Sequence, residues 1–539
     1  MKNNRTWIWP VVTAVALALG ICFGTVFSNQ LGGGLFGKKR SLTGREKMME
    51  VFDLIEDEYV DEISIDSLIE QTLPDMLIGL DPHSSYVPYE EAAKAKADLE
   101  GQFSGVGITF QIVNDTLSVI DVISGGPAEK VGMMPGDRII KVDDVTLSEI
   151  DLTNEKVFKM LRGDKGTHVE VTVKRRGAKK PLTFNITRDD IPVESIDAAY
   201  VISPGVGYIR ISKFARHTYE EMLAALSKLR AEGADKFIID LRYNGGGYME
   251  PAVLMANEFL PAGREIVSTR GRKSGDDQSV GSDGSGAFID YPMVVLVNEF
   301  SASASEIFTG AMQDNDRAWI IGRRTFGKGL VQHPVTLTDG SEVRLTVQRY
   351  YTPSGRSIQK EYNRGGALAY EEDLLRRFER GESFSADSIT FDESLRYKTL
   401  SGRTVYGGGG IMPDIFVPED TTGINSYYRA LINENLPSKY AYEYCDINRD
   451  RLSKAQTFDE LMSMLPNDNT LLNDFANYAA QNGVNKRPVY LNESREELLS
   501  ILKGQIARGF FGLEGYYRSI NQRDNNIEEA LKYINKPLE

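Results

Sequence analysis

The chain has 539 residues, of which 41% are hydrophobic and 26% charged, and this ordinary globular composition excludes a collagen, a coiled-coil rod and a wholly disordered chain. Its length predicts about three to four domains. The 77 acidic residues exceed the 62 basic ones by 15, which argues against a nucleic-acid partner because binding phosphates requires a basic surface. Two cysteines and four scattered histidines form no disulfide framework and no metal-binding motif, so we expect no metal site.

The first thirty residues contain a long apolar run. It extends from about Trp7 to Phe27 without a charge, and roughly twenty apolar residues suffice to cross a bilayer as a helix. We therefore predict a transmembrane anchor over residues 1–30, with a cleaved signal peptide as the alternative. Basic residues are more numerous after this run than before it, and the positive-inside rule alone would place the rest of the chain in the cytoplasm.

Three further regions flank the segment with the clearest periodicity, residues 189–420. Residues 31–98 read as a linker and an N-terminal helical region, because apolar residues such as Met48, Val51 and Ile55 recur at helical spacing. Residues 99–188 combine short strand patterns with glycine turns and predict a small α+β module. Residues 421–539 are polar and helical; in Arg495–Ile506 the apolar face fits either a core or an oligomerisation element, and the pattern favours a core.

Residues 189–420 alternate strand and helix patterns, which predicts a parallel sheet covered by helices on both faces. The expected elements are strand 207–211, helix 219–232, strand 236–241, helix 251–259, strand 293–297, helix 303–313 and strand 318–322. A hairpin signal at residues 337–342 lies within a β region that runs to Tyr351. The chain is thus predicted to be a multi-domain protein of α/β and α+β regions.

The run S-A-S-A-S-E at Ser301–Glu306 lies where the buried strand 293–297 gives way to a helix. A serine at such a turn is exposed at the carboxyl edge of the sheet, where ligand sites of α/β proteins lie. The helix N-terminus offers unpaired N–H groups that stabilise a developing oxyanion. The structural alternative is helix capping, for which serine is equally well suited.

Lys328 lies between two glycines after the last strand of this series. A buried lysine loses proton affinity and acts as a general base, so it could activate a serine hydroxyl. The spacing from Gly322 to Lys328 also approaches a phosphate-binding P-loop, but Gly329 stands where that motif needs Ser or Thr, and the following residues resemble a strand. A solvated surface lysine is the third interpretation.

Several motifs together resemble the carboxyl-terminal processing (tail-specific) serine proteases, which use a Ser–Lys dyad. The matching segments are G-V-G-I-T-F at 105–110, G-G-P-A-E-K-V-G-M-M-P-G-D-R-I at 125–139, D-L-R-Y-N-G-G-G at 240–247, S-A-S-A-S-E at 301–306, F-G-K-G-L-V-Q at 326–332, Y-Y-T-P-S-G-R-S-I-Q at 350–359 and G-I-M-P-D at 410–414. They cover about residues 45–420 in the order of the family. The resemblance implies an α/β Ser–Lys peptidase core at 189–420 and a PDZ domain at 99–188.

The resemblance also assigns roles to individual residues. Ser303 is the expected nucleophile, Lys328 the general base and Gln332 the residue that helps to hold the lysine. The oxyanion hole is expected from the backbone of Ala304 and of the Gly245–Gly247 turn, with Gly245 and Gly246 as the leading candidates. Arg242 and Asn244 are expected to shape this turn.

For the PDZ domain, the resemblance implies binding of extended peptides with a free C-terminus. The residues expected to hold the terminal carboxylate are Gly105, Val106, Gly107 and Ile108. The substrates are therefore proteins or peptides with free C-termini, no cofactor is required, and a homo-oligomer is possible. Members of this family are typically exported, so we expect a single-pass inner-membrane protein with a periplasmic catalytic domain, against the charge count around the anchor. An inactive, protease-like PDZ scaffold that binds C-terminal peptides is the alternative function.

Overall fold

The computed structural model describes residues 8–30, 42–113, 115–123, 125–363 and 366–538. The chain divides into two units, residues 1–76 and 77–539. The first unit holds α1 (Ile8–Gln30), α2 (Gly44–Glu58) and most of α3 (Ile65–Ile78). Thr43 begins α2 with a capping box, in which its backbone N–H and the Glu46 carboxylate bond at 2.9 Å.

None of the helices in the described residues combines the length and apolar character that a membrane span requires. The anchor predicted for residues 1–30 begins in a part of the chain, residues 1–7, that lies outside the described residues. Both the anchor and the compartment remain predictions.

The second unit starts with β1 (Ser85–Val87) and α4 (Tyr89–Glu100) and continues into the α+β module. The module contains β2 (Gln102–Gly105), β3 (Ile108–Val113), β4 (Thr116–Val122), α5 (Pro127–Lys130), β5 (Arg138–Val142), β6 (Val145–Thr146), α6 (Asn154–Leu161), β7 (His168–Lys174), β8 (Leu182–Thr187) and β9 (Asp189–Pro192). Its sheet has the order β3-β4-β5-β7-β8, while β2 pairs with β9 where the chain enters and leaves the module. Strand β3 is therefore an edge strand of this sheet.

The peptidase-like core is a six-stranded sheet in the order β10-β11-β12-β15-β16-β21. Its strands are β10 (Ile196–Ser203), β11 (Val206–Ile211), β12 (Lys236–Asp240), β15 (Met293–Val297), β16 (Trp319–Gly322) and β21 (Ile415–Phe416). The five strands from β11 to β21 are parallel, whereas β10 runs antiparallel to β11. The predicted parallel sheet is thus mixed, because a tight turn at Gly205 returns β10 directly into β11.

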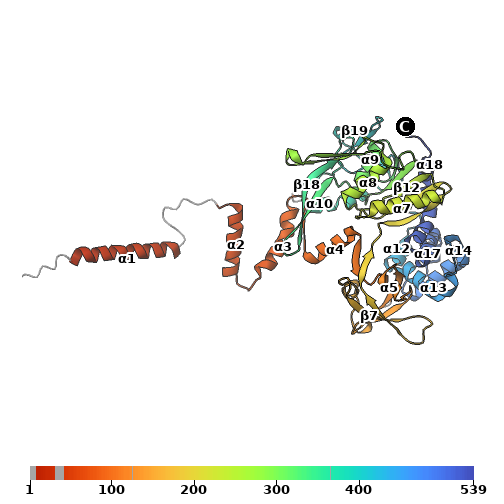
Figure 1. Cartoon of the computed structure of the whole chain (residues 1–539), viewed down its shortest axis with the longest axis horizontal. Coiled ribbons are helices and arrows are strands. Elements are labelled where there is room, and N and C mark those ends of the chain that lie inside the picture. Colours follow the sequence, from red (N-terminus) through yellow and green to blue (C-terminus); the bar gives the residue numbers. More distant parts are fainter. Residues whose placement is uncertain (1–7, 31–41, 114, 124, 364–365, 539) are drawn as a thin grey trace, which may run out of the picture. The chain divides into compact units, whose positions relative to one another are not determined.

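Helices cover both faces of this sheet, as predicted, but they come from different parts of the chain (Figure 1). On one face pack α7 (Thr218–Ala231), α8 (Met249–Phe259) and α9 (Ala304–Asp314), which follow strands of the sheet. The other face packs against α18 (Asn525–Tyr533), through Ile527 and Ala530. The end of the chain therefore completes the core of the peptidase-like region.

A second sheet lies beside the first and has the order β1-β18-β13-β14, with β17 also paired to β18. It consists of β13 (Glu265–Gly271), β14 (Gln278–Gly281), β17 (Leu330–Thr336) and β18 (Glu342–Tyr351) besides β1. The hairpin of β17 and β18 confirms the turn signal at residues 337–342. Between β18 and β21 the chain forms α10 (Ala367–Glu371), α11 (Asp373–Glu379), β19 (Arg396–Lys398) and β20 (Thr404–Tyr406).

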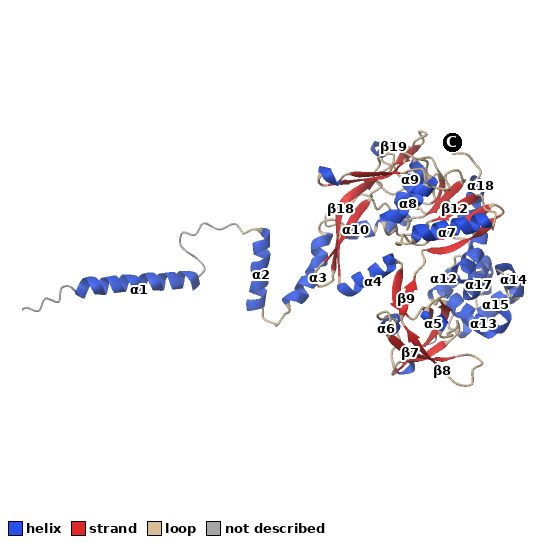
Figure 2. Cartoon of the chain, in the orientation of Figure 1, coloured by secondary structure: helices blue, strands red, loops and turns tan. Residues whose placement is uncertain are grey.

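The C-terminal region is helical, as expected, and its helices gather around a core of their own (Figure 2). They are α12 (Ser426–Asn433), α13 (Leu436–Leu452), α14 (Phe458–Met464), α15 (Asp468–Gln481), α16 (Pro488–Glu493) and α17 (Arg495–Ile520), followed by α18. Leu498 and Leu502 have no exposed surface and belong to this core, which confirms the interpretation of that apolar face as core.

Candidate functional site

The structure distinguishes the three serines of the S-A-S-A-S-E run. Ser301 and Ser305 are fully buried, and their hydroxyls donate to the carbonyls of Leu241 and Asn244, each at 2.8 Å. Ser303 instead is partly exposed and lines a cavity of about 450 Å³. The outer two serines thus fasten the run to the end of β12 and the residues after it, and the middle serine faces open space.

Ser303 has a strained backbone. It precedes the first residue of α9 with φ 56° and ψ −115°, a region that a residue with a Cβ seldom occupies and that costs about 1–3 kcal/mol. Its N–H donates to the Glu306 carboxylate at 2.9 Å, and its carbonyl lies 3.2 Å from the hydroxyl of the buried Tyr350. These contacts hold the residue in a sharp turn between strand and helix, which presents its side chain at the cavity.

Lys328 lines the same cavity from the loop between β16 and β17. Its amine donates to Gln332 Oε1 at 2.9 Å, and the Gln332 amide in turn donates to the carbonyl of His83. Burial lowers the pKa of Lys328, and the nearby Arg344 acts in the same direction, against the opposing effects of Glu306 and Asp81. In this environment, the neutral amine forms more readily than on a surface lysine.

One buried carboxylate connects the serine to the lysine. Glu306 accepts hydrogen bonds from the backbone N–H groups of Ser303 (2.9 Å), Gly327 (2.7 Å) and Lys328 (2.9 Å) and from the hydroxyl of Thr325 (2.5 Å). Its side chain is inaccessible to solvent, and this burial raises its pKa although the four donors oppose the shift. The Tyr350 hydroxyl adds a parallel connection, since it also contacts the carbonyl of Lys328.

The two residues of the predicted dyad therefore line one cavity, but no hydrogen bond joins their side chains in the described residues. The Lys328 amine is bound to Gln332 instead. Catalytic hydrogen bonds are often absent or long in a ligand-free enzyme and form when the substrate binds.

The glycine turn (residues 242–247) lies against the serine. A Cβ at Gly246 would stand 2.8 Å from the Ser303 Cβ, and the φ of Gly246 is +101°, so only glycine fits this position. The Gly246 N–H is already bonded to Asn244 Oδ1 at 2.9 Å. Of the residues predicted to form an oxyanion hole, Gly245 and Ala304 line the cavity, and Gly246 does not.

The predicted carboxylate loop of the α+β module lies where β2 leads into β3. Val106 is buried and its carbonyl accepts from the Ala128 N–H at 2.9 Å, while Gly107 has φ +78°. Gly105 is the last residue of β2, and Ile108 begins the terminal strand β3. On this strand, the ring of Phe110 packs with its centroid 5.2 Å from that of the Phe158 ring on α6. The loop, the strand and the helix thus form one apolar face.

Sequence reasoning missed several contributors to the site. Glu306 stands three residues after Ser303, which is the capping-box position, but nothing local indicates that it reaches the lysine loop. His83 was noted only as a scattered histidine, although its carbonyl holds Gln332 and burial lowers its own pKa to about 4. In the described residues, no three His, Cys, Asp or Glu side chains are grouped so as to hold a metal ion.

Comparison with known families matches three parts of the chain. The model of peptidase family S41 matches residues 205–367, and that of the PDZ domain matches residues 104–187. Residues 427–512 match a family of unknown function, DUF8443.

Named relatives come from several bacteria. A carboxy-terminal-processing protease of Bartonella bacilliformis is 35% identical over 391 residues, which cover 71% of this chain and 87% of the relative. The carboxy-terminal processing protease CtpB of Bacillus subtilis is 34% identical over 319 residues, covering 59% and 66%. A photosystem II D1 C-terminal processing protease is 26% identical with a TM-score of 0.34, covering 70% of this chain and 94% of that structure.

We predict that Glu306→Gln loosens both loops that the carboxylate joins. In glutamine, an NH2 group replaces one of the two carboxylate oxygens and faces N–H or O–H donors. Each buried donor that loses its acceptor in this way costs about 1–3 kcal/mol. The free energy of unfolding should fall by that amount, and the amides of residues 303 and 328 should exchange hydrogen faster. Urea denaturation and hydrogen-exchange mass spectrometry measure both. The control is Glu155→Gln, which removes an exposed ion-pair partner; equal behaviour of the two variants would contradict the role of Glu306.

Proposed function

Since the chain belongs to peptidase family S41 and is a carboxy-terminal processing serine protease by its relatives, we propose that it hydrolyses polypeptides with Ser303 as nucleophile and Lys328 as general base. The observation that carries the proposal is the single buried carboxylate of Glu306, which fixes the backbones of both residues at one cavity. An inactive scaffold would have no need for a lysine whose pKa is lowered beside a partly exposed serine.

In the proposed reaction, the neutral Lys328 amine leaves Gln332 and accepts the proton of the Ser303 hydroxyl while the serine oxygen attacks the peptide carbonyl. The N–H groups of Ala304 and Gly245 are the proposed donors to the resulting oxyanion. When the C–N bond breaks, Lys328 returns its proton to the departing amine. Water then attacks the acyl-enzyme, again with Lys328 as base, and releases the carboxylate product and the free serine.

The first test removes each member of the dyad. Ser303→Ala and Lys328→Ala should each abolish cleavage of a peptide substrate while the circular-dichroism spectrum stays that of the unaltered protein, because neither side chain is part of a hydrophobic core cluster. Ser279→Ala, at an exposed position on the edge strand β14, is the matched control and should retain activity. Substantial cleavage by purified Lys328→Ala would refute the base assignment.

The lowered pKa of Lys328 determines the expected pH dependence. The ammonium form cannot accept a proton, so kcat/KM should rise with pH through the pKa of Lys328 and become constant above it. Because burial lowers that pKa, the midpoint should lie below the ordinary value of 10.5. A pH series with a short peptide measures this profile, and a midpoint at or above 10.5 would exclude a desolvated lysine as the base.

The PDZ domain is proposed to select substrates by their free C-terminus. Terminal strand β3 offers its edge to an extended peptide, and the loop at Gly105–Ile108 offers backbone N–H groups to a carboxylate. Amidation of the substrate's C-terminus should raise KM about tenfold to a hundredfold, since a charge-assisted hydrogen bond contributes about 1.5–3 kcal/mol. Gly107→Ala, whose Cβ would meet Ile191 at 3.1 Å, should reduce this difference. Equal KM values for the free and the amidated substrate would contradict tail selection.

A further inference from the structure

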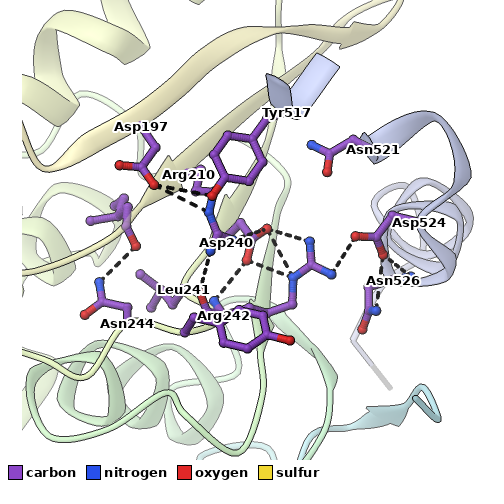
Figure 3. A network of polar contacts seen from close by, with 12 residues as sticks. Asp197, Arg210, Asp240, Leu241, Arg242, Asn244, Tyr517, Asn521, Asp524 and Asn526 are labelled. Carbon is purple, nitrogen blue, oxygen red and sulfur yellow. Dashed lines mark hydrogen bonds and ion pairs between the residues drawn. The ribbon is translucent and has the colours of Figure 1, made fainter. Parts of the chain in front are cut away.

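The C-terminal region reaches the glycine turn through one carboxylate. Asp524 lies just before α18, and its Oδ2 accepts a hydrogen bond of 2.6 Å from Nη1 of Arg242, the first residue of the glycine turn (Figure 3). Both side chains are largely buried, with 12% of Arg242 and 18% of Asp524 exposed. A charge-assisted bond of this length in such surroundings fixes the guanidinium firmly.

The remaining donors of Arg242 are bound to Asp240 at the end of β12. Nη2 donates to Asp240 Oδ2 at 2.6 Å and Nε to Oδ1 at 3.0 Å. Asp240 also pairs with Arg210 at 3.1 Å, so this fully buried carboxylate faces two guanidinium groups. Arg210 in turn pairs with Asp197 at 3.7 Å, and Asp524 supplies a second carboxylate to Arg242, so removing Asp524 would break a largely buried ion pair of that guanidinium.

Arg242 determines where the glycine turn starts, and the turn reaches the proposed oxyanion hole within three residues. The backbone carbonyl of Arg242 accepts a hydrogen bond from Arg210 Nη2 at 2.9 Å. Two residues later, the Asn244 carbonyl accepts from the Ala302 N–H at 3.0 Å and from the Ser305 hydroxyl. A displacement of Arg242 therefore moves the backbone that carries Gly245, and with it the loop that carries Ser303.

We infer that Asp524 is a positioning residue of the protease, which holds the glycine turn in its catalytic geometry through Arg242. The C-terminal helical region thereby becomes a part of the active enzyme and not only an appended domain. This inference rests on the proposed function, in which the N–H group of Gly245 in the glycine turn stabilises the oxyanion. Loss of the contact should affect the transition state, where the oxyanion develops, more than binding of the peptide.

Asp524→Asn is the sharpest test. Asp524 also caps α18 by accepting from the Asn526 N–H at 2.8 Å, and asparagine caps helices as well as aspartate does. The substitution therefore keeps the cap through Oδ1 and places an amide NH2 group, which cannot accept a hydrogen bond, where Oδ2 faced Arg242, so both the charge and the hydrogen bond to Arg242 are lost. Asp524→Ser, which keeps a capping oxygen but is too short to reach Arg242, is the second variant. The control is Glu496→Gln, which breaks the exposed 3.1 Å pair with Arg523 in the same region.

Steady-state cleavage of one peptide by the full chain, together with thermal unfolding, decides the inference. We expect kcat of both Asp524 variants to fall about tenfold to a hundredfold, the effect of a displacement of about 1 Å in an active site, with KM within twofold. Because removing one partner of a largely buried ion pair also lowers the melting temperature, cleavage is measured at a temperature where thermal unfolding shows each variant to be folded. Affinity for a peptide boronic acid, which mimics the tetrahedral state, should fall by a similar factor.

The outcomes separate this inference from the function on which it rests. An unchanged kcat in both Asp524 variants overturns the inference. A decrease in kcat also overturns it if the Glu496→Gln control shows the same decrease, or if the fraction of unfolded protein accounts for the whole decrease. If Ser303→Ala cleaves the same peptide as fast as the unaltered chain, the proposed function fails instead, whatever the Asp524 variants do.

Discussion

The site depends on a carboxylate that is buried because four donors surround it. Removing an ionised carboxyl group from water is costly, and proteins tolerate it only where hydrogen bonds replace the lost hydration. Glu306 meets this condition with three backbone N–H groups and the Thr325 hydroxyl. Since those donors belong to two separate loops, the same bonds that stabilise the carboxylate also fix the distance between the backbone of Ser303 and that of Lys328.

This constraint explains why two unusual backbone conformations persist side by side. Ser303 has a positive φ despite its Cβ, and Gly327 has φ +91° with its Cα so close to Gly410 that a Cβ would stand 2.9 Å from the Gly410 N–H nitrogen. Each conformation points one N–H group at Glu306. The strain at the serine is therefore balanced by a hydrogen bond to a group that could not be buried without it.

Much of this architecture follows from local sequence patterns, and the parts that do not are the contacts between distant residues. Strand 293–297 was predicted with its observed bounds, because five consecutive apolar residues between turns leave few alternatives. The antiparallel edge strand β10 and the two-residue strand β21 were not predicted, since partner choice in a sheet leaves no local signal. The family resemblance selected Ser303 and Lys328 among the candidates that the sequence pattern left open. His83 and Asp524 were not predicted, because they lie 249 and 282 positions along the chain from Gln332 and Arg242, the residues that they contact.

The C-terminal helices illustrate how such distant contacts organise a multi-domain enzyme. Helix α13 contacts the PDZ domain through Asp446, whose carboxylate accepts a hydrogen bond from Arg138 of β5 at 2.9 Å. Asp524, at the start of α18, pairs with Arg242 of the glycine turn. Helix α13 shares an apolar core with α17, the helix that precedes Asp524 in the chain. A packed core transmits a displacement because it has few voids to absorb it. The C-terminal helical region thus contacts both the PDZ domain and the glycine turn, and residues 427–512 of it match a family of unknown function.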